Sequence, residues 1–260
     1  MVVGNWKMHK TVAGSVAAVR RLSRRLKNSR GVEILIAPSF TALRSVGEIL
    51  KGLKGTRLRL AAQNVHWEEE GAFTGEVSPV QLKEAGCRAV LVGHSERRRL
   101  FGETDEIVHR KVFGALKQGL SPVLCVGETL EQRKADMTAG VLKEQLGRCL
   151  AGVAKEQADR IIVAYEPVWA IGTGQVATAI QISEVHGLIR QELAGILGHE
   201  PAERIRILYG GSVTPENIEA LAAIQTLDGV LVGGASLKPD GFAAIVKTVA
   251  KIKSGKDVNR

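Results

Sequence analysis

The sequence predicts an α/β protein, a single closed (β/α)8 barrel, and three observations support this prediction. Short apolar runs rich in Val, Ile and Leu recur every ~25–45 residues, the scale of a βαβ unit. Most of these runs are apolar on consecutive residues, which is typical of parallel strands buried on both faces. The chain of 260 residues carries eight such runs, with no linker rich in Pro, Gly or Ser between them.

Regular alternation of strands and helices leaves two architectures, a doubly wound open sheet and a closed barrel. Eight units favour closure, and closed barrels of this length commonly form one domain. We therefore expect one barrel domain over residues 1–260, in which residues after about 251 form a polar tail.

The eight expected strands follow one another along the chain at Met1–Asn5, Val32–Ala37, Leu58–Gln63, Ala89–Gly93, Pro122–Val126, Ile161–Tyr165, Ile205–Tyr209 and Val230–Gly233. The first of them is short, so we expect a frayed edge of the barrel there. A helix is expected over Thr11–Asn28, because apolar residues repeat at helical spacing on one face. That face comprises Val12, Val16, Val19, Leu22 and Leu26.

The chain is basic, with a formal net charge of +9. Much of the excess lies in the first helix and just after it, at Arg20, Arg21, Arg24, Arg25, Lys27 and Arg30. These residues fall opposite the apolar face, so a solvated helix surface is the favoured interpretation and weak binding of polyanions the alternative. No stacking aromatic residues alternate with the charges, and we expect no nucleic-acid partner.

Composition also bears on the compartment. No apolar run approaches the ~20 residues that span a bilayer, and the first residues do not form a secretory signal. The three cysteines, Cys87, Cys125 and Cys149, are widely spaced and form no metal-binding pattern. We expect a cytoplasmic protein with no membrane association and no metal site.

Polar residues and glycine-rich turns follow five of the expected strands. Asn5 and Lys7 follow the first strand, His94 and Glu96 the fourth, and Glu166 the sixth. Gly-Gly turns follow the seventh and eighth strands. Function in this fold lies at the carboxyl ends of the strands, so these groups should meet at one mouth of the barrel.

These residue types suit proton transfer next to a carbonyl in a phosphorylated substrate. A carboxylate can remove a carbon-bound proton, an imidazole can hydrogen-bond the enediolate oxygens, and a lysine can stabilise their negative charge. Glycine-rich turns offer backbone N–H groups to a phosphate.

Five segments, in this order, resemble motifs of the triosephosphate isomerase family, and the resemblance covers nearly the whole chain. A single Gly-Gly-Ser would be weak support, whereas five long motifs in order are specific. They are Gly4-Asn5-Trp6-Lys7-Met8, Gly93-His94-Ser95-Glu96-Arg97-Arg98, the run from Ala164 to Gly174 that contains Tyr165-Glu166-Pro167, Tyr209-Gly210-Gly211-Ser212-Val213 and Leu231-Val232-Gly233-Gly234-Ala235-Ser236-Leu237.

The resemblance implies a cofactor-free enzyme that interconverts dihydroxyacetone phosphate and D-glyceraldehyde 3-phosphate through an enediolate, in glycolysis and gluconeogenesis. Glu166 would be the catalytic base, made stronger by desolvation under a lid, and His94 the electrophile. Lys7 would bind the substrate and stabilise charge, with Asn5 beside it. Glu96 would pair with Lys7, and a structural salt bridge is as plausible for it as a catalytic task.

Ser95 is expected to cap the helix that follows His94. The positive end of that helix would disfavour imidazolium, an arrangement for which this family is itself a standard example. His94 is therefore expected to be neutral.

The resemblance also implies a mobile lid from Pro167 to about Ala177. The phosphate would bind backbone N–H groups of Gly172, Ser212, Gly233 and Gly234. For Gly210 and Gly211, a turn that requires positive φ and a phosphate contact are equally plausible.

The segment Gln63–Glu76 resembles the family's interface loop, in which Thr74 would reach a neighbouring subunit's site, so a homodimer is implied. Two departures stand out: His9, where Asn is usual in the family, and the second lid hinge Gln175-Val176-Ala177, where Lys-Thr-Ala is common.

Two other functions compete with this one. Another phosphate-binding barrel could act on a different sugar phosphate, although the Glu166 and His94 motifs argue against it. A binding protein that has lost catalysis and uses its basic surface would show salt-sensitive nucleic-acid binding without turnover.

Overall fold

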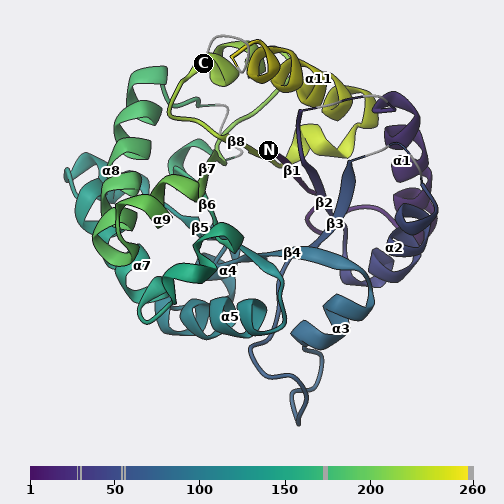
Figure 1. Ribbon diagram of the computed structural model, residues 1–260, viewed down its shortest axis with the longest axis horizontal. Helices are drawn as coiled ribbons and strands as arrows, with labels where there is room; N and C mark the ends of the chain where they lie inside the picture. Colours follow the sequence, from purple (N-terminus) through teal and green to yellow (C-terminus); the bar gives the residue numbers. More distant parts are fainter. Residues whose placement is uncertain (28, 30, 54, 56, 172–174, 257–260) are drawn as a thin grey trace.

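The structure is a computed structural model that describes residues 1–27, 29, 31–53, 55, 57–171 and 175–256. It is a closed barrel in which each strand pairs in parallel with the next and the last pairs with the first (Figure 1). The strands are β1 (Val2–Asn5), β2 (Ile34–Ala37), β3 (Leu58–Ala62), β4 (Cys87–Val92), β5 (Ser121–Val126), β6 (Ile162–Tyr165), β7 (Arg206–Tyr209) and β8 (Gly229–Val232).

All eight predicted strands are confirmed, with ends that move by one or two residues. The prediction of a frayed first strand is wrong. Val2, Val3 and Gly4 pair with both β2 and β8, and the whole of β1 is buried. The N-terminal ammonium donates to the Asp228 carbonyl at 2.8 Å, which ties the chain end to the neighbouring strand.

Helices and short 3₁₀ turns surround the barrel (Figure 1). They are α1 (Val12–Arg25), η1 (Phe40–Ala42), α2 (Leu43–Gly52), α3 (Pro79–Glu84), α4 (Ser95–Phe101), α5 (Asp105–Lys117), α6 (Leu130–Lys134), α7 (Thr138–Leu150), η2 (Lys155–Arg160), η3 (Val168–Ala170), α8 (Ala179–Leu197), α9 (His199–Arg204), α10 (Ile218–Ala223), η4 (Gly234–Leu237) and α11 (Pro239–Lys256). None of these helices is long and apolar enough to cross a bilayer.

The strands separate two apolar layers, which explains why their sequences do not alternate. Inside the barrel, one cluster comprises Val3, Leu35, Leu91, Leu208 and residues like them. The strand neighbours of these residues point outward and pack in a second cluster under the helices. Because both faces of each strand are buried, consecutive positions must be apolar.

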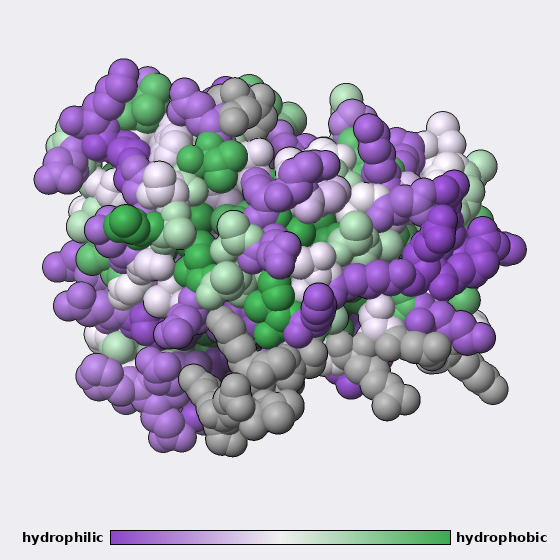
Figure 2. All heavy atoms as spheres, turned by 90° about the horizontal axis from the view of Figure 1, so that it is seen from above, coloured by the Kyte–Doolittle hydropathy of each residue, from purple (hydrophilic) through white to green (hydrophobic). Residues whose placement is uncertain are grey.

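The first helix confirms most of its prediction. Thr11 is its N-cap and accepts a hydrogen bond from Gly14 N at 3.2 Å, while Leu22 and Leu26 are buried. Val12 is 39% exposed and does not belong to the buried face, because it is the first residue of the helix. The basic side chains are exposed, and hydrophilic residues gather on the α1 side of the face in Figure 2. Arg30 lies outside the described residues.

The polar C-terminal segment begins later than expected. Helix α11 continues to Lys256, so residues 251–256 belong to it rather than to a tail. Apolar residues such as Phe242 and Val249 bury one face of this helix against the barrel. Residues 257–260 lie outside the described chain.

Candidate active site

A cavity of about 260 Å³ lies at the carboxyl ends of the strands and brings most of the predicted site residues together. Gly172, expected to bind phosphate, lies outside the described residues. The lining includes Asn5, Lys7, His94, Glu166, Ile171, Gly210, Gly211, Ser212, Val213, Thr214, Leu231, Gly233, Gly234 and Ala235.

Lys7 has an unusual backbone conformation, with φ of 50°, the left-handed region that costs a non-glycine residue about 1–2 kcal/mol. Three hydrogen bonds hold it there. Its N–H donates to Asn5 Oδ1 at 3.0 Å, and its carbonyl accepts from Gln63 Nε2 at 2.8 Å. Its ammonium donates to Glu96 Oε1 at 2.6 Å. The conformation therefore aims the ammonium into the cavity.

Glu96 is the ionic partner of Lys7, as expected. Burial acts to raise the pKa of Glu96, but the hydrogen bond and charge of Lys7, with the charge of Arg99, lower it overall. Glu96 is therefore ionised at neutral pH and balances the lysine charge when no substrate is bound.

His94, not Ser95, is the N-cap of α4, which corrects the expected cap. Its Nδ1 accepts from Glu96 N at 3.2 Å, and Ser95 is the first helical residue. An accepting Nδ1 carries no proton, so these partners assign the proton to Nε2 of a neutral imidazole. Nε2 lies 3.1 Å from Glu166 Oε1.

Glu166 follows β6 and is buried, with only 2% of its side chain exposed. Its Oε2 accepts from Ser95 N at 3.0 Å, while Oε1 faces His94. The backbone beneath it is close-packed: a Cβ on Gly127 would lie 1.9 Å from the Glu166 carbonyl oxygen. The carboxylate is thus held at the amino end of α4, to one side of the cavity.

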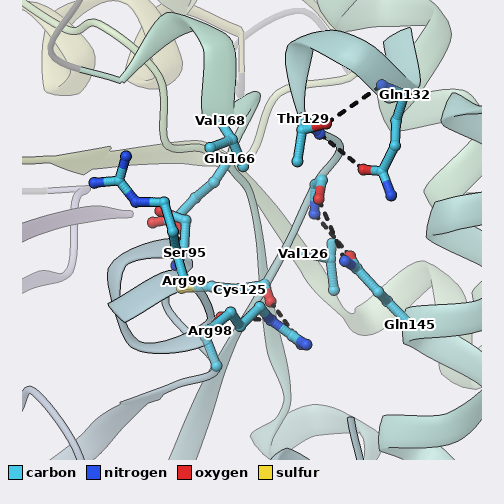
Figure 3. Close-up of a pocket in the computed structure, with 12 residues that line it drawn as sticks. Ser95, Arg98, Arg99, Cys125, Val126, Thr129, Gln132, Gln145, Glu166 and Val168 are labelled. Atoms are coloured by element: carbon cyan, nitrogen blue, oxygen red, sulfur yellow. Dashed lines mark hydrogen bonds between the residues drawn. The ribbon is translucent and has the colours of Figure 1, made fainter. Parts of the chain in front are cut away.

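A second cavity, of about 360 Å³, lies behind the same carboxylate. Figure 3 shows Glu166 on one side of it and Thr129, Gln132 and Gln145 on the other. The Gln145 side chain bonds Gly127 N at 2.8 Å and Gly127 O at 3.3 Å, so it is occupied in holding the turn after β5. Glu166 therefore separates two spaces and has room to move.

The glycines after β7 and β8 do not have positive φ. A turn that requires positive φ therefore does not explain why these positions are glycine. At Gly210 an added Cβ would lie 2.9 Å from Glu166 Cγ, and at Gly211 it would lie 2.2 Å from the Tyr209 hydroxyl oxygen. Close packing therefore requires these two glycines. Gly234 has open space around its Cα, so its backbone is accessible from the cavity.

The predicted lid is anchored at both ends. Glu128, fully buried, accepts from Trp169 Nε1 at 2.9 Å and from the Tyr165 hydroxyl at 3.0 Å, and its carbonyl accepts from Val168 N at 3.1 Å. At the other end, Ala177 N donates to the Tyr209 hydroxyl at 3.4 Å. Residues 172–174, the expected lid tip, lie outside the described chain.

Two residues that hold the site were not among the predicted site residues. Gln63 clamps the carbonyls of Lys7 and Ala37, both at 2.8 Å, and Glu128 anchors the lid. Gln63 is the first residue after β3 and Glu128 the second after β5, and polar residues just after a strand were the signal that identified the other site residues. The same criterion applied to every strand would have found them.

The loop Gln63–Glu76 projects from the barrel between β3 and α3 (Figure 1). His66 stacks on Trp67 and Phe73, with ring centroids 4.1 Å apart in both pairs. Phe73 is still 42% exposed, and Met8, in the loop between β1 and α1, is 95% exposed. Thr74 is exposed at the same projection.

Comparison with known proteins agrees with this geometry. The family model for triosephosphate isomerase matches residues 1–249. The triosephosphate isomerase of Pelobacter propionicus is 52% identical over 246 residues, covering 95% of this chain and 97% of that protein. That of Carboxydothermus hydrogenoformans is 51% identical with the same coverage. The crystal structure of triosephosphate isomerase from Bartonella henselae superposes with a TM-score of 0.85 at 40% identity, covering 95% of this chain and 97% of that one. The chain therefore belongs to the triosephosphate isomerase family.

Proposed function

We propose that this chain interconverts dihydroxyacetone phosphate and D-glyceraldehyde 3-phosphate, with Glu166 as catalytic base and His94 as electrophile. Membership of the family supports the reaction itself and its place in glycolysis and gluconeogenesis. The observation that best supports the residue roles is the convergence of Lys7, His94 and Glu166 on one cavity at the carboxyl ends of the strands.

The proposed proton transfer begins at the carboxylate. Glu166 removes a proton from the carbon next to the substrate carbonyl, and the electron pair of that C–H bond forms the enediolate. The hydroxyl proton then passes to the former carbonyl oxygen by way of the His94 imidazole, and the carboxylic acid returns its proton to the neighbouring carbon. This completes the isomerisation without a cofactor. Because Ser95 N–H and His94 engage both carboxylate oxygens in the free protein, Glu166 must rotate away from them before it can act.

The imidazole and the lysine stabilise the charge that develops on the oxygens. The Nε2–H of His94 is free to turn from Glu166 to a substrate oxygen once the carboxylate moves. Lys7 stabilises the enediolate charge from the opposite side and is held in place by Asn5 and Gln63. Glu96 acts as a positioning residue, because its contacts are with Lys7 and His94 rather than with the cavity.

The phosphate would bind backbone N–H groups of Ser212, Gly233 and Gly234, joined by Gly172 when the lid closes. Ser212, Gly233 and Gly234 line the cavity, and the open space at Gly234 supports a close approach of the ligand to the backbone. Closing the segment Pro167–Ala177 would exclude water from the reactive enediolate.

We further propose a homodimer assembled through the projecting loop Gln63–Glu76. The exposed side chains of Phe73 and Met8 support this proposal, because a contact between subunits at this loop would remove their apolar surface from water. Thr74 would then lie near Asn5 and Lys7 of the neighbouring subunit.

The experiment is isomerisation of glyceraldehyde 3-phosphate by purified protein, coupled to reduction of the ketone product. We expect rapid turnover of the triose and none of five- or six-carbon sugar phosphates in parallel assays. Turnover of a larger sugar phosphate in preference to the triose would favour the competing barrel enzyme. Absence of any turnover by a folded protein would favour the binding-protein alternative.

A further inference from the structure

Gln145 lies on α7, on the face of the helix that packs toward the barrel. It stands four residues after Val141 and three after Leu142, both of which are buried, so the three side chains share one face. Burying a polar group costs free energy unless it finds hydrogen-bond partners. Gln145 is half-buried, so both ends of its amide need a partner on this otherwise apolar face.

Both ends of the Gln145 amide contact one residue, Gly127, in the turn after β5 (Figure 3). The side-chain oxygen accepts from Gly127 N at 2.8 Å, and the side-chain nitrogen donates to Gly127 O at 3.3 Å. The pairing of β5 with β6 ends at Val126 and Tyr165, so Gly127 lies just beyond the ladder. The amide of Gln145 therefore takes the place of a neighbouring strand and fixes the main chain of Gly127.

The turn that Gln145 holds supports the main chain of Glu166. Glu166 N donates to Val126 O at 2.7 Å. A Cβ on Gly127 would lie 1.9 Å from the carbonyl oxygen of Glu166 and 2.6 Å from its carbonyl carbon, so the two main chains are in direct contact. A displacement of Gly127 would therefore move the main chain that carries the carboxylate.

Packing alone does not hold this turn in place. Gly127, Gln145 and Glu166 all line the cavity of about 360 Å³, so the turn borders open space. Helix α7, in contrast, is packed between α5 and α8 (Figure 1). Gln145 thus ties the turn to a firmly packed helix at a point where the cavity would otherwise leave it room to shift.

We propose that Gln145 is a positioning residue for the proton transfer, because it fixes Gly127 and, through it, the main chain of Glu166. This inference rests on the proposed role of Glu166 as base. In the free protein Ser95 N and His94 also hold the carboxylate, but Glu166 must leave both of them to reach the substrate. During the reaction the position of its main chain therefore decides the distance between the carboxylate and the C–H bond.

The rate of proton transfer depends steeply on this distance. Reacting atoms should lie about 3–3.5 Å apart, and a misplacement of about 1 Å can cost about 100-fold in rate. Loss of the two Gln145 hydrogen bonds should shift the turn by less than this, since Val126 O still accepts from Glu166 N. Without the Gln145 amide we therefore expect about a tenfold loss of kcat, with little change in substrate binding.

Gln145→Met removes the donor and the acceptor but keeps the length of the side chain. It should lower kcat for glyceraldehyde 3-phosphate by about tenfold and change KM by less than about twofold. Inhibition by inorganic phosphate should be unchanged, because the proposed phosphate-binding residues Ser212, Gly233 and Gly234 line the other cavity. Gln191→Met, the same substitution at an exposed position of α8, is the matched control and should behave as the unmodified protein.

A primary isotope effect distinguishes a misplaced base from a loss of folded protein. The substrate is glyceraldehyde 3-phosphate with deuterium on the carbon next to the aldehyde. A misplaced base slows cleavage of this bond, so the isotope effect on kcat/KM should be larger for Gln145→Met than for the unmodified protein, whereas partial unfolding would leave it unchanged. Gln145→Asn, one methylene too short to hold both groups of Gly127, should give the same increase and provides the test if the methionine variant does not fold.

An unchanged isotope effect in both Gln145 variants would overturn the proposal, whether or not kcat falls. Weaker phosphate inhibition with an unchanged isotope effect would show instead that Gln145 acts through Glu128, the lid anchor next to Gly127. Glu166→Gln, assayed alongside, separates this inference from the proposed function. A large loss of turnover in Glu166→Gln with normal kinetics in Gln145→Met overturns only the positioning role, whereas near-normal turnover in Glu166→Gln overturns the assigned base as well.

Discussion

Replacing Gln63 with Leu should damage the site without touching any group that contacts the substrate. The amide donates to the carbonyls of Lys7 and Ala37, both at 2.8 Å. Leu has a similar size but no donor, so the Lys7 carbonyl loses this partner and the Ala37 carbonyl keeps only its hydrogen bond from Trp6 N. At about 1 kcal/mol for each hydrogen bond, with a further penalty for unsatisfied groups, the variant should lose about 1–3 kcal/mol of unfolding free energy.

The effect on catalysis follows from the backbone of Lys7. Its left-handed conformation, with φ of 50°, is retained only while its contacts hold it. Without the Gln63 clamp the residue can relax, which displaces the ammonium from the cavity. A loss of about 1–2 kcal/mol in transition-state stabilisation corresponds to a roughly 5- to 30-fold lower kcat/KM.

The assay compares urea unfolding and isomerase kinetics of Gln63→Leu with those of Gln191→Leu, which makes the same substitution at an exposed position of α8. The control should differ little from the unmodified protein in both measurements. If Gln63→Leu loses stability but keeps its kcat/KM, the clamp is structural only. If it loses neither, the reasoning about Lys7 is refuted.

Three further predictions concern charge, assembly and pH. Lys7→Gln should lower kcat/KM for both triose phosphates and weaken inhibition by inorganic phosphate, and unchanged kinetics would exclude its proposed role. Phe73→Asp should shift the protein from dimer to monomer, as measured by sedimentation at micromolar concentration, and isomerase activity should fall in parallel. A monomeric unmodified protein would contradict the proposed interface. Burial lowers the pKa of His186 from 6.5 to about 4, so the unfolded chain binds more protons between these values. About 3 kcal/mol of unfolding free energy should therefore be lost as pH falls from 6.5 to 4. The unfolding free energy of His186→Asn should depend less steeply on pH over this range. An unchanged slope of unfolding free energy against pH would exclude this histidine as the cause.

The fold could be predicted from the sequence because strands buried on both faces have apolar residues at consecutive positions. Runs such as Val123–Val126 are apolar at every position, and their side chains pack alternately in the cluster inside the barrel and in the cluster outside it. The ends of elements were less predictable, since they depend on contacts distant in sequence. Strand β1 is intact because β2 and β8 flank it, and α11 continues to Lys256 because its apolar face packs on the barrel.

The sequence predicted that Lys7, His94 and Glu166 meet and that Glu96 pairs with Lys7, but not the other contacts that hold the candidate site. Lys7, His94 and Glu166 could be placed at one mouth because each follows a strand. No local pattern indicates that His94 Nδ1 itself caps α4, or that Glu166 rests on the Ser95 N–H. Glycine is also ambiguous in sequence: Gly210 and Gly211 are required by close packing, although a turn with positive φ would use the same residue.

The central claim is that the Glu166 carboxylate moves the carbon-bound proton, and it is tested most directly by isomerisation in heavy water. The unmodified protein should release product with deuterium at the carbon that receives the proton, because the acid exchanges with solvent before it returns the proton. Glu166→Gln keeps the shape but removes the base, so turnover should fall by about 10²–10⁴-fold. Glu219→Gln, at an exposed position of α10, should behave as the unmodified protein. Near-normal turnover by Glu166→Gln, with deuterium still entering the product, would contradict the assignment.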